Sequence, residues 1–143
     1  MIEIEQARIT LAARPRGVHL VTEEVLSQLP ALARFEAGIL HLFLQHTSAA
    51  ISINENADPD VRTDTRTFID DLIPDGFGKF RHTLEGPDDM PAHLKSMLFG
   101  CDLTIPVTAG RPALGTWQGI YLIEGRESGG SRRLVATVYG RVV

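Results

Sequence analysis

Three histidines, His46, His82 and His93, are the residues of this sequence whose type and surroundings point most directly to metal chemistry. Three neutral imidazoles around one ion, with a fourth position open to water, form a known kind of catalytic metal site. Their separations of 36 and 11 residues match no compact zinc motif. The spacing leaves two interpretations open: a joint metal site, or one packed and two solvated histidines.

A polar stretch between a strand and a helix offers groups for acid–base catalysis. Asn54 and Glu55 stand at its start, and Asp64 lies near the middle of the following helix, where it caps nothing. A carboxylate near the histidines can act as a general base, and an amide can orient a ligand or substrate. The alternative is structural: Asp58 caps the helix, and the acids along it form a solvated strip.

A second block, from Gly115 to Gly119, leads into an apolar strand and contains the only tryptophan, Trp117. Its glycines allow a ligand to approach the backbone, and Gln118 can hydrogen-bond a neighbouring polar group. Glu124 ends the same strand, and the sequence leaves open whether it is a base or a fourth metal ligand. Four arginines could contact a phosphate: Arg81, Arg126, Arg132 and Arg133.

Composition narrows the class of protein. The chain has 143 residues, is 43% hydrophobic and 22% charged, and carries a net charge of −4. These values predict one folded domain over residues 1–143 and argue against nucleic acid or an anionic membrane as partner. The single cysteine, Cys101, cannot form an internal disulfide, and the acidic N-terminus does not resemble a signal peptide. We expect a cytoplasmic protein with no membrane span.

The elements that must position these groups follow from apolar periodicity and from turn residues. Strands at both ends of the chain with helices between them predict an α+β fold. Helices are expected to begin at Thr22, at Asp58-Pro59 and at Pro91, and the stretch 75–90 is expected to be loop. The second helix should bury a stripe made of Val61, Thr65, Phe68, Ile69 and Leu72. The expected strands cover residues 2–9, 39–45, 49–54, 102–107, 115–124 and 134–139.

Several blocks of the sequence resemble the YjbQ-like family, which carries the label secondary thiamine-phosphate synthase enzyme. They occur in the family's order and cover nearly the whole chain. The Asn-Glu-Asn-Ala-Asp-Pro block and the Gly-Thr-Trp-Gln block are the most specific. The matching blocks are Leu44–Ala49, Ile53–Val61, Arg81-His82, His93–Lys95 and Leu114–Ile120.

The resemblance implies a β-sandwich-like α+β fold with two or three helices, a homotrimer, and a clustered histidine site that holds a divalent metal, zinc or magnesium. On the matching positions His46, His82 and His93 would be the ligands. Asn54, Glu55, Asp64 and Gln118 would be the catalytic groups beside them. Trp117 would lie beside them, and the sequence itself offers Arg81 and Arg126 as contacts for a small phosphorylated substrate.

The activity that the resemblance implies joins a pyrimidine pyrophosphate to a thiazole phosphate, a reaction suited to a metal ion and cationic side chains. The chain has no dedicated phosphate-binding loop, so this activity could be secondary. Two alternatives stay open: a metal-dependent hydrolase of small substrates, and a non-catalytic module that binds a metal or another ligand.

Overall fold

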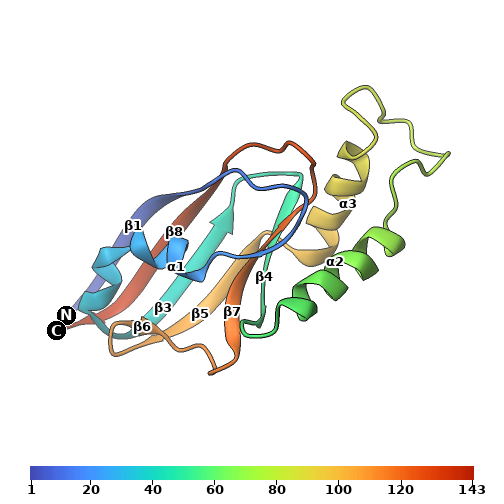
Figure 1. The fold of residues 1–143 in the computed structure, drawn as a ribbon. Helices are drawn as coiled ribbons and strands as arrows, with labels where there is room; N and C mark the ends of the chain where they lie inside the picture. The colour runs from blue at the N-terminus through green and yellow to red at the C-terminus, as the bar shows by residue number, and fades with distance from the viewer.

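Two antiparallel β-sheets share one apolar core in the computed structural model, which describes residues 1–143 (Figure 1). The larger sheet has the strand order β1-β8-β3-β5-β6, and the smaller one has the order β2-β7-β4. The expected β-sandwich-like α+β class is therefore confirmed. The strands are β1 (Ile2–Leu11), β2 (Gly17–Leu20), β3 (Phe35–Leu44), β4 (Ala49–Glu55), β5 (Asp102–Thr108), β6 (Arg111–Pro112), β7 (Gln118–Glu124) and β8 (Arg132–Val142).

Alternating side chains on the long strands build this core. In β3 and β8 every second residue points inward, because successive side chains of a strand lie on opposite faces. The six inward side chains are at most 1% exposed, and burying each large one stabilises the fold by about 1.5–3 kcal/mol. They are Leu40, Leu42, Leu44, Leu134, Ala136 and Val138.

The first helical segment begins as expected but is capped differently. α1 (Thr22–Ser27) is followed by a short 3₁₀ helix, η1 (Pro30–Arg34). Thr22 makes no capping hydrogen bond, and its Oγ1 instead accepts from the backbone N–H of Ile120 at 2.8 Å. The hydroxyl therefore ties α1 to β7. The strand β2, which precedes α1, was missed because Arg14-Pro15-Arg16-Gly17 signals only a break.

The second helix, α2 (Pro59–Leu72), starts where the sequence predicts, because the Asp58 carboxylate accepts the N–H of Asp60 at 2.9 Å. Its predicted buried stripe is wrong in part. Ile69 is buried, but Phe68 is 68% exposed and Leu72 is 56% exposed. The helix lies over the small sheet at one end of the molecule (Figure 1). Its apolar face is only partly covered, as the exposure of Phe68 and Leu72 shows.

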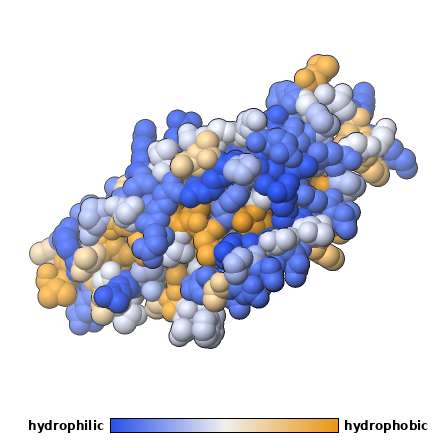
Figure 2. Space-filling view, viewed as in Figure 1, coloured by the Kyte–Doolittle hydropathy of each residue, from blue (hydrophilic) through white to orange (hydrophobic).

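The third helix, α3 (Asp89–Phe99), begins two residues before the predicted start at Pro91. The loop between α2 and α3 extends beyond the body of the molecule, and both termini lie together at the opposite end (Figure 1). Apolar atoms are exposed at the tip of this loop and beside the termini (Figure 2). None of the helices combines the length and the apolar composition needed to cross a bilayer.

A buried ion pair fastens α3 to α2. The Lys95 side chain is 2% exposed, and its Nζ donates to Asp70 Oδ1 at 2.8 Å. Partial burial would raise the pKa of Asp70, but the hydrogen bond and charge of Lys95 and the charges of nearby arginines hold it below its ordinary value. The pair fixes the rotation of α3 about its axis and so helps to set where the helix directs His93.

We predict that Asp70→Asn will lower the free energy of unfolding by about 2–3 kcal/mol near neutral pH, because it leaves the buried Lys95 ammonium without an anion. Lys95→Met should cost less, since Asp70 is 30% exposed and keeps Arg66 within 3.4 Å. Denaturant titration measures both values. An equal or larger loss for Lys95→Met would contradict this account.

The same pair predicts a pH dependence. A carboxyl whose pKa is lowered by folding adds stability above its unfolded pKa of ~3.9 and loses it as the pH falls through the folded pKa. The stability difference between the wild type and Asp70→Asn should therefore shrink on acidification below about pH 4.

Candidate functional site

Two histidines and one carboxylate meet at the N-terminus of α3. Asp89 Oδ2 lies 2.6 Å from Nε2 of His82 and 3.0 Å from Nε2 of His93. The two imidazole rings have centroids 5.3 Å apart, and one donor atom from each of the three residues lies within 4.8 Å of the others. Asp89 is buried, whereas the side chains of His82 and His93 are 42% and 27% exposed. The carboxylate of the group is therefore buried, and the two imidazole rings are accessible to solvent.

A main-chain hydrogen bond fixes the protonation of His93. Its Nδ1 lies 2.7 Å from the carbonyl oxygen of Thr47. A carbonyl oxygen only accepts, so Nδ1 carries a proton, and Nε2 is the ring nitrogen left to face another group. Nε2 faces Asp89 Oδ2 across 3.0 Å. The position between a ring nitrogen and a carboxylate oxygen suits a cation, either a proton that joins them in a hydrogen bond or a metal ion that binds both.

Gly125 lets α3 approach the strands closely enough for this hydrogen bond. A Cβ at position 125 would lie 2.6 Å from the Cβ of Ala92 and 2.7 Å from the carbonyl oxygen of Ser48. The N–H of Gly125 donates to that same carbonyl at 3.1 Å. A larger residue at 125 would push α3 outward and separate His93 from Thr47.

Arg126 holds the buried carboxylate. Its Nη1 donates to Asp89 Oδ1 at 2.6 Å, its Nε to Asp88 Oδ2 at 3.2 Å, and its Nη2 to the carbonyl oxygen of Glu85 at 2.9 Å. Burial would raise the pKa of Asp89, but the His82 hydrogen bond and the charges of His93 and Arg126 lower it below its ordinary value. Asp89 is thus kept ionised with Oδ2 turned toward the histidines.

His46, the third expected ligand, lies outside this group. Its Nε2 accepts the backbone N–H of Arg133 at 2.8 Å, and its Nδ1 lies 3.4 Å from Nη1 of Arg132. Burial and the positive charges of these two arginines lower its pKa, so the ring is neutral. The expected three-histidine cluster is therefore corrected: His82 and His93 come together, Asp89 takes the third place, and the Nε2 lone pair of His46 is already engaged.

The expected catalytic groups lie at the far end of β4. Asn54 and Glu55 end a strand that begins at Ala49, three residues after His46. Seven strand residues span about 20 Å, so these groups cannot share an ion with His93. Asp64 and Asn54 line a separate cavity between α2 and the small sheet, and Asn54 Oδ1 accepts the N–H of Glu55 at 2.8 Å.

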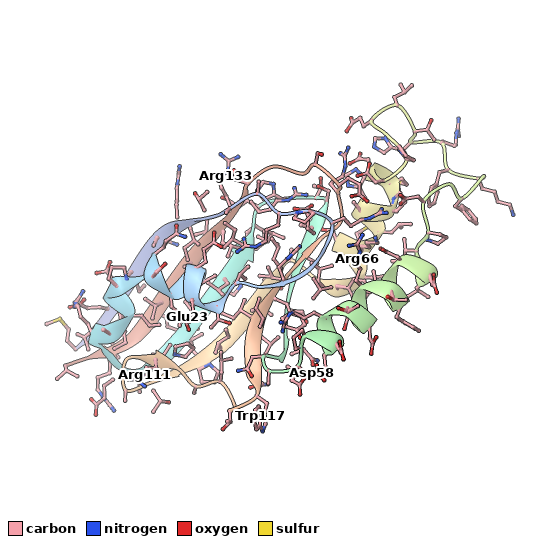
Figure 3. The ribbon with its side chains drawn as sticks, viewed as in Figure 1. Glu23, Asp58, Arg66, Arg111, Trp117 and Arg133 are labelled. Atoms are coloured by element: carbon pink, nitrogen blue, oxygen red, sulfur yellow. The ribbon has the colours of Figure 1, made fainter.

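The tryptophan block also lies away from the histidines. Trp117 is 65% exposed in the loop before β7, near Asp58 and distant from α3 (Figure 3). Gln118 Oε1 accepts the backbone N–H of Gly115 at 2.7 Å, so its amide braces the loop. Of the residues expected to contact substrate, Arg81 is exposed in the loop beside His82, and Arg126 supports Asp89.

Glu124 is part of the supporting structure. Its side chain is fully buried and forms a two-point ion pair with Arg132, with Nε to Oε2 at 2.6 Å. Arg132 also donates to Ser48 Oγ at 2.8 Å, and Glu124 Oε1 accepts the N–H of Arg126 at 3.0 Å. With these contacts Glu124 has no free oxygen directed at His82 or His93, so it is neither the base nor the fourth ligand that the sequence left open.

The donor set fits a borderline divalent ion. Two imidazole nitrogens and one carboxylate oxygen are the protein ligands of several catalytic zinc sites, which leave a further position for water or substrate. The Thr47 and Arg126 contacts supply the outer hydrogen bonds that orient the ligating atoms of such sites. The residues that could hold a metal are therefore His82, Asp89 and His93.

Asp89 was missed because the helix was expected to start at Pro91. With the helix beginning at Asp89, this residue and His93 are four positions apart and lie on the same face. The signal was present in the sequence as Asp-x-x-x-His, but it has meaning only once the segment is known to be helical.

Comparison with known proteins identifies close relatives. A family model described as UPF0047 protein YjbQ-like matches residues 7–141. The UPF0047 protein YjbQ of Escherichia coli O157:H7 is 52% identical over 135 residues, which cover 94% of this chain and 97% of that protein. UPF0047 protein sll1880 of Synechocystis is 45% identical over 137 residues, covering 96% of this chain and 92% of the relative.

Solved structures agree with the fold. A YbjQ-like protein of unknown function from Sulfolobus solfataricus superposes with a TM-score of 0.84 at 24% identity, covering 99% of this chain and 100% of that one. A conserved hypothetical protein from Thermus thermophilus gives a TM-score of 0.77 at 32% identity, covering 95% and 98%.

The expected thiamine-phosphate synthase activity is wrong by these comparisons. The relatives carry the description UPF0047 protein, and the Sulfolobus structure is described as a protein of unknown function. No description among these relatives supports the joining of a pyrimidine to a thiazole. The geometry agrees, because Arg126 and Arg132, two of the four arginines proposed for phosphate, are held by Asp88, Asp89 and Glu124.

We predict that Arg126→Gln will weaken zinc binding by about 10–100-fold, because Asp89 loses the contact that orients its carboxylate. Competition against a chromophoric chelator measures the affinity. Arg133→Gln is the matched control, since Arg133 is exposed and forms no ion pair. Unchanged affinity in Arg126→Gln, with the wild-type melting temperature retained, would show that Asp89 orients itself without the arginine.

Proposed function

The chain belongs to the UPF0047 protein YjbQ-like family, and we propose that it binds a divalent metal ion between His82, Asp89 and His93 for hydrolytic chemistry on a small substrate. One observation carries this proposal. His93 donates Nδ1–H to the Thr47 carbonyl and so turns Nε2 toward the Asp89 carboxylate at 3.0 Å. A metal ion that replaces the proton on Nε2 can bind this nitrogen and the carboxylate oxygen together.

The ligand types favour zinc over magnesium. Magnesium takes oxygen ligands and keeps much of its water, whereas imidazole nitrogen suits zinc and its transition-metal neighbours. Two of the three donors here are imidazoles. A bound ion of this class supplies Lewis acidity and makes water a stronger nucleophile near neutral pH.

Each residue of the group has a separate task. Asp89 supplies the negative charge, and its burial keeps that charge from being screened by water. His93 stays in one tautomer because its second nitrogen is held by Thr47. His82 lies in the α2–α3 loop and is the most exposed member, so a substrate reaches the group from its side.

A small anionic substrate is the class that the surroundings support. Arg81 is adjacent to His82 in the chain, is exposed and forms no ion pair. A free guanidinium in the loop that carries His82 favours a carboxylate or phosphate, because its planar fork matches two oxygens at once. Arg126 cannot share this task while each of its nitrogens donates to Asp88, Asp89 or Glu85.

We also retain the homotrimer as a proposal. The outer face of the large sheet carries no helix and exposes large apolar side chains, including Ile4, which pairs with Tyr139 across β1 and β8. Ile2, Ile4, Phe43 and Tyr139 are between 43% and 72% exposed. Apolar surface of this kind supports contact with other copies of the chain.

We predict that three substitutions will each weaken zinc binding by roughly 100-fold or more: His82→Ala, Asp89→Ala and His93→Ala. Loss of a residue that only orients a ligand, such as Arg126, weakens metal affinity by about 10–100-fold. Calorimetric titration and elemental analysis of purified variants measure this. His46→Ala should keep its zinc affinity, because the Nε2 of His46 is already bonded to Arg133. A loss of zinc in His46→Ala equal to that in His93→Ala would restore the three-histidine site.

Zinc affinity should also fall on acidification, because protons compete with the ion for the imidazole nitrogens. An affinity that does not change between pH 5 and pH 8 would argue against imidazole ligands. A screen of small phosphate and carboxylate esters, with and without zinc, then tests turnover.

The assembly proposal predicts a solution mass of three times the 15.7 kDa of one chain. Light scattering at micromolar concentration measures it. Ile4→Lys places a charge in the exposed apolar face and should shift the mass toward the monomer. A wild-type mass of one chain would refute the trimer.

A further inference from the structure

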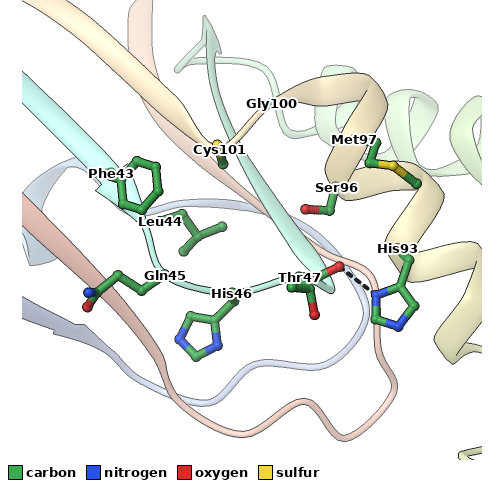
Figure 4. A pocket seen from close by; sticks show the side chains of 10 residues that line it. All are labelled: Phe43, Leu44, Gln45, His46, Thr47, His93, Ser96, Met97, Gly100 and Cys101. Carbon is green, nitrogen blue, oxygen red and sulfur yellow. Dashed lines mark hydrogen bonds between the residues drawn. The ribbon is translucent and has the colours of Figure 1, made fainter.

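A cavity of about 690 Å³ opens beside the metal group. It runs from Phe43 and Cys101 at one end to Thr47 and His93 at the other (Figure 4). The metal group and the cavity share His93 itself. The volume is within the range of small-molecule pockets.

The two ends of the cavity differ in chemistry. Phe43, Leu44 and Cys101 give the far end apolar side chains, with the amide of Gln45 at its edge, whereas Met97 and the hydroxyls of Ser96 and Thr47 lie toward His93 (Figure 4). No charged side chain other than a histidine lines it. An apolar chain is favoured in the far end, since each buried methylene improves binding by about fourfold.

We infer that this cavity binds the apolar chain of an anionic amphiphile whose carboxylate or phosphate head lies at the His82–Asp89–His93 group. The inference rests on the proposed metal site for the head and on the cavity alone for the chain. Arg81, the residue before His82 in the chain, is an exposed cation available to the same head. The substrate class is therefore a short-chain carboxylate or phosphate, and a compact, fully polar metabolite would leave the apolar wall uncovered.

Cys101 provides a direct reporter, because it is the only cysteine, is partly exposed and lines the apolar end. The experiment measures its alkylation rate by iodoacetamide in the full-length protein, with and without zinc, in the presence of butanoate, hexanoate or octanoate. Octanoate should slow alkylation at least tenfold at saturation. The concentration needed should fall about fourfold for each added methylene, and zinc should lower it further.

Two variants on α3 test the location. Met97→Lys places a charge in the cavity wall and should abolish the chain-length dependence. Leu98→Lys is the matched control: Leu98 is the next residue, is 63% exposed and does not line the cavity. It should keep wild-type protection. Both positions are on the surface, with Met97 71% exposed, so the substitutions leave the core intact.

The outcomes separate this inference from the metal proposal. Zinc binding without protection of Cys101 at any chain length overturns the inference and leaves the metal site standing. If Cys101 is protected equally with and without bound zinc, the claim that the anionic head of the same ligand lies at the metal ion is overturned. Absence of zinc binding overturns the proposed function, while chain-length-dependent protection in the metal-free protein still supports the cavity as the site of the apolar chain.

Discussion

The hydrogen bond from His93 to the main-chain carbonyl of Thr47 links the fold to the group of His82, Asp89 and His93. It joins the second turn of α3 to the connection between β3 and β4, two elements that are 46 residues apart in the chain. Because the acceptor is a carbonyl, it determines which imidazole nitrogen is free. The neighbouring ion pairs and the close approach at Gly125 hold α3 near enough to the β3–β4 connection for this hydrogen bond to form.

Two charge networks maintain that separation from opposite sides. Behind the strands, Arg132 and Glu124 form a buried pair that also holds Ser48, next to Thr47. On the helix side, Arg126 reaches from the end of β7 to the acids that start α3. Both arginines leave the β7–β8 connection in different directions. A buried ion pair of this kind contributes little net stability. Its main effect here is to hold the strands and the helix in one arrangement.

Much of the fold could be predicted from periodicity, and the site only in part. The Asp58-Pro59 start of α2 and the long strands follow from local signals. The stripe on α2 failed at Phe68 because periodicity identifies an apolar face but not whether another element covers it. Asp89 was missed because its role depends on a helix start that the Gly- and Pro-rich approach obscures. The tautomer of His93 depends on a contact between distant segments, which no local pattern contains.

The use of a main-chain acceptor has an evolutionary consequence. Every residue type at position 47 offers the same carbonyl, so the side chain there can drift while the imidazole keeps its orientation. Selection falls instead on position 125, where any side chain would collide with Ala92 and Ser48 although the residue touches no ligand. In a comparison of related sequences, the invariant residue around His82, Asp89 and His93 would thus be a glycine, a residue that offers no chemistry of its own.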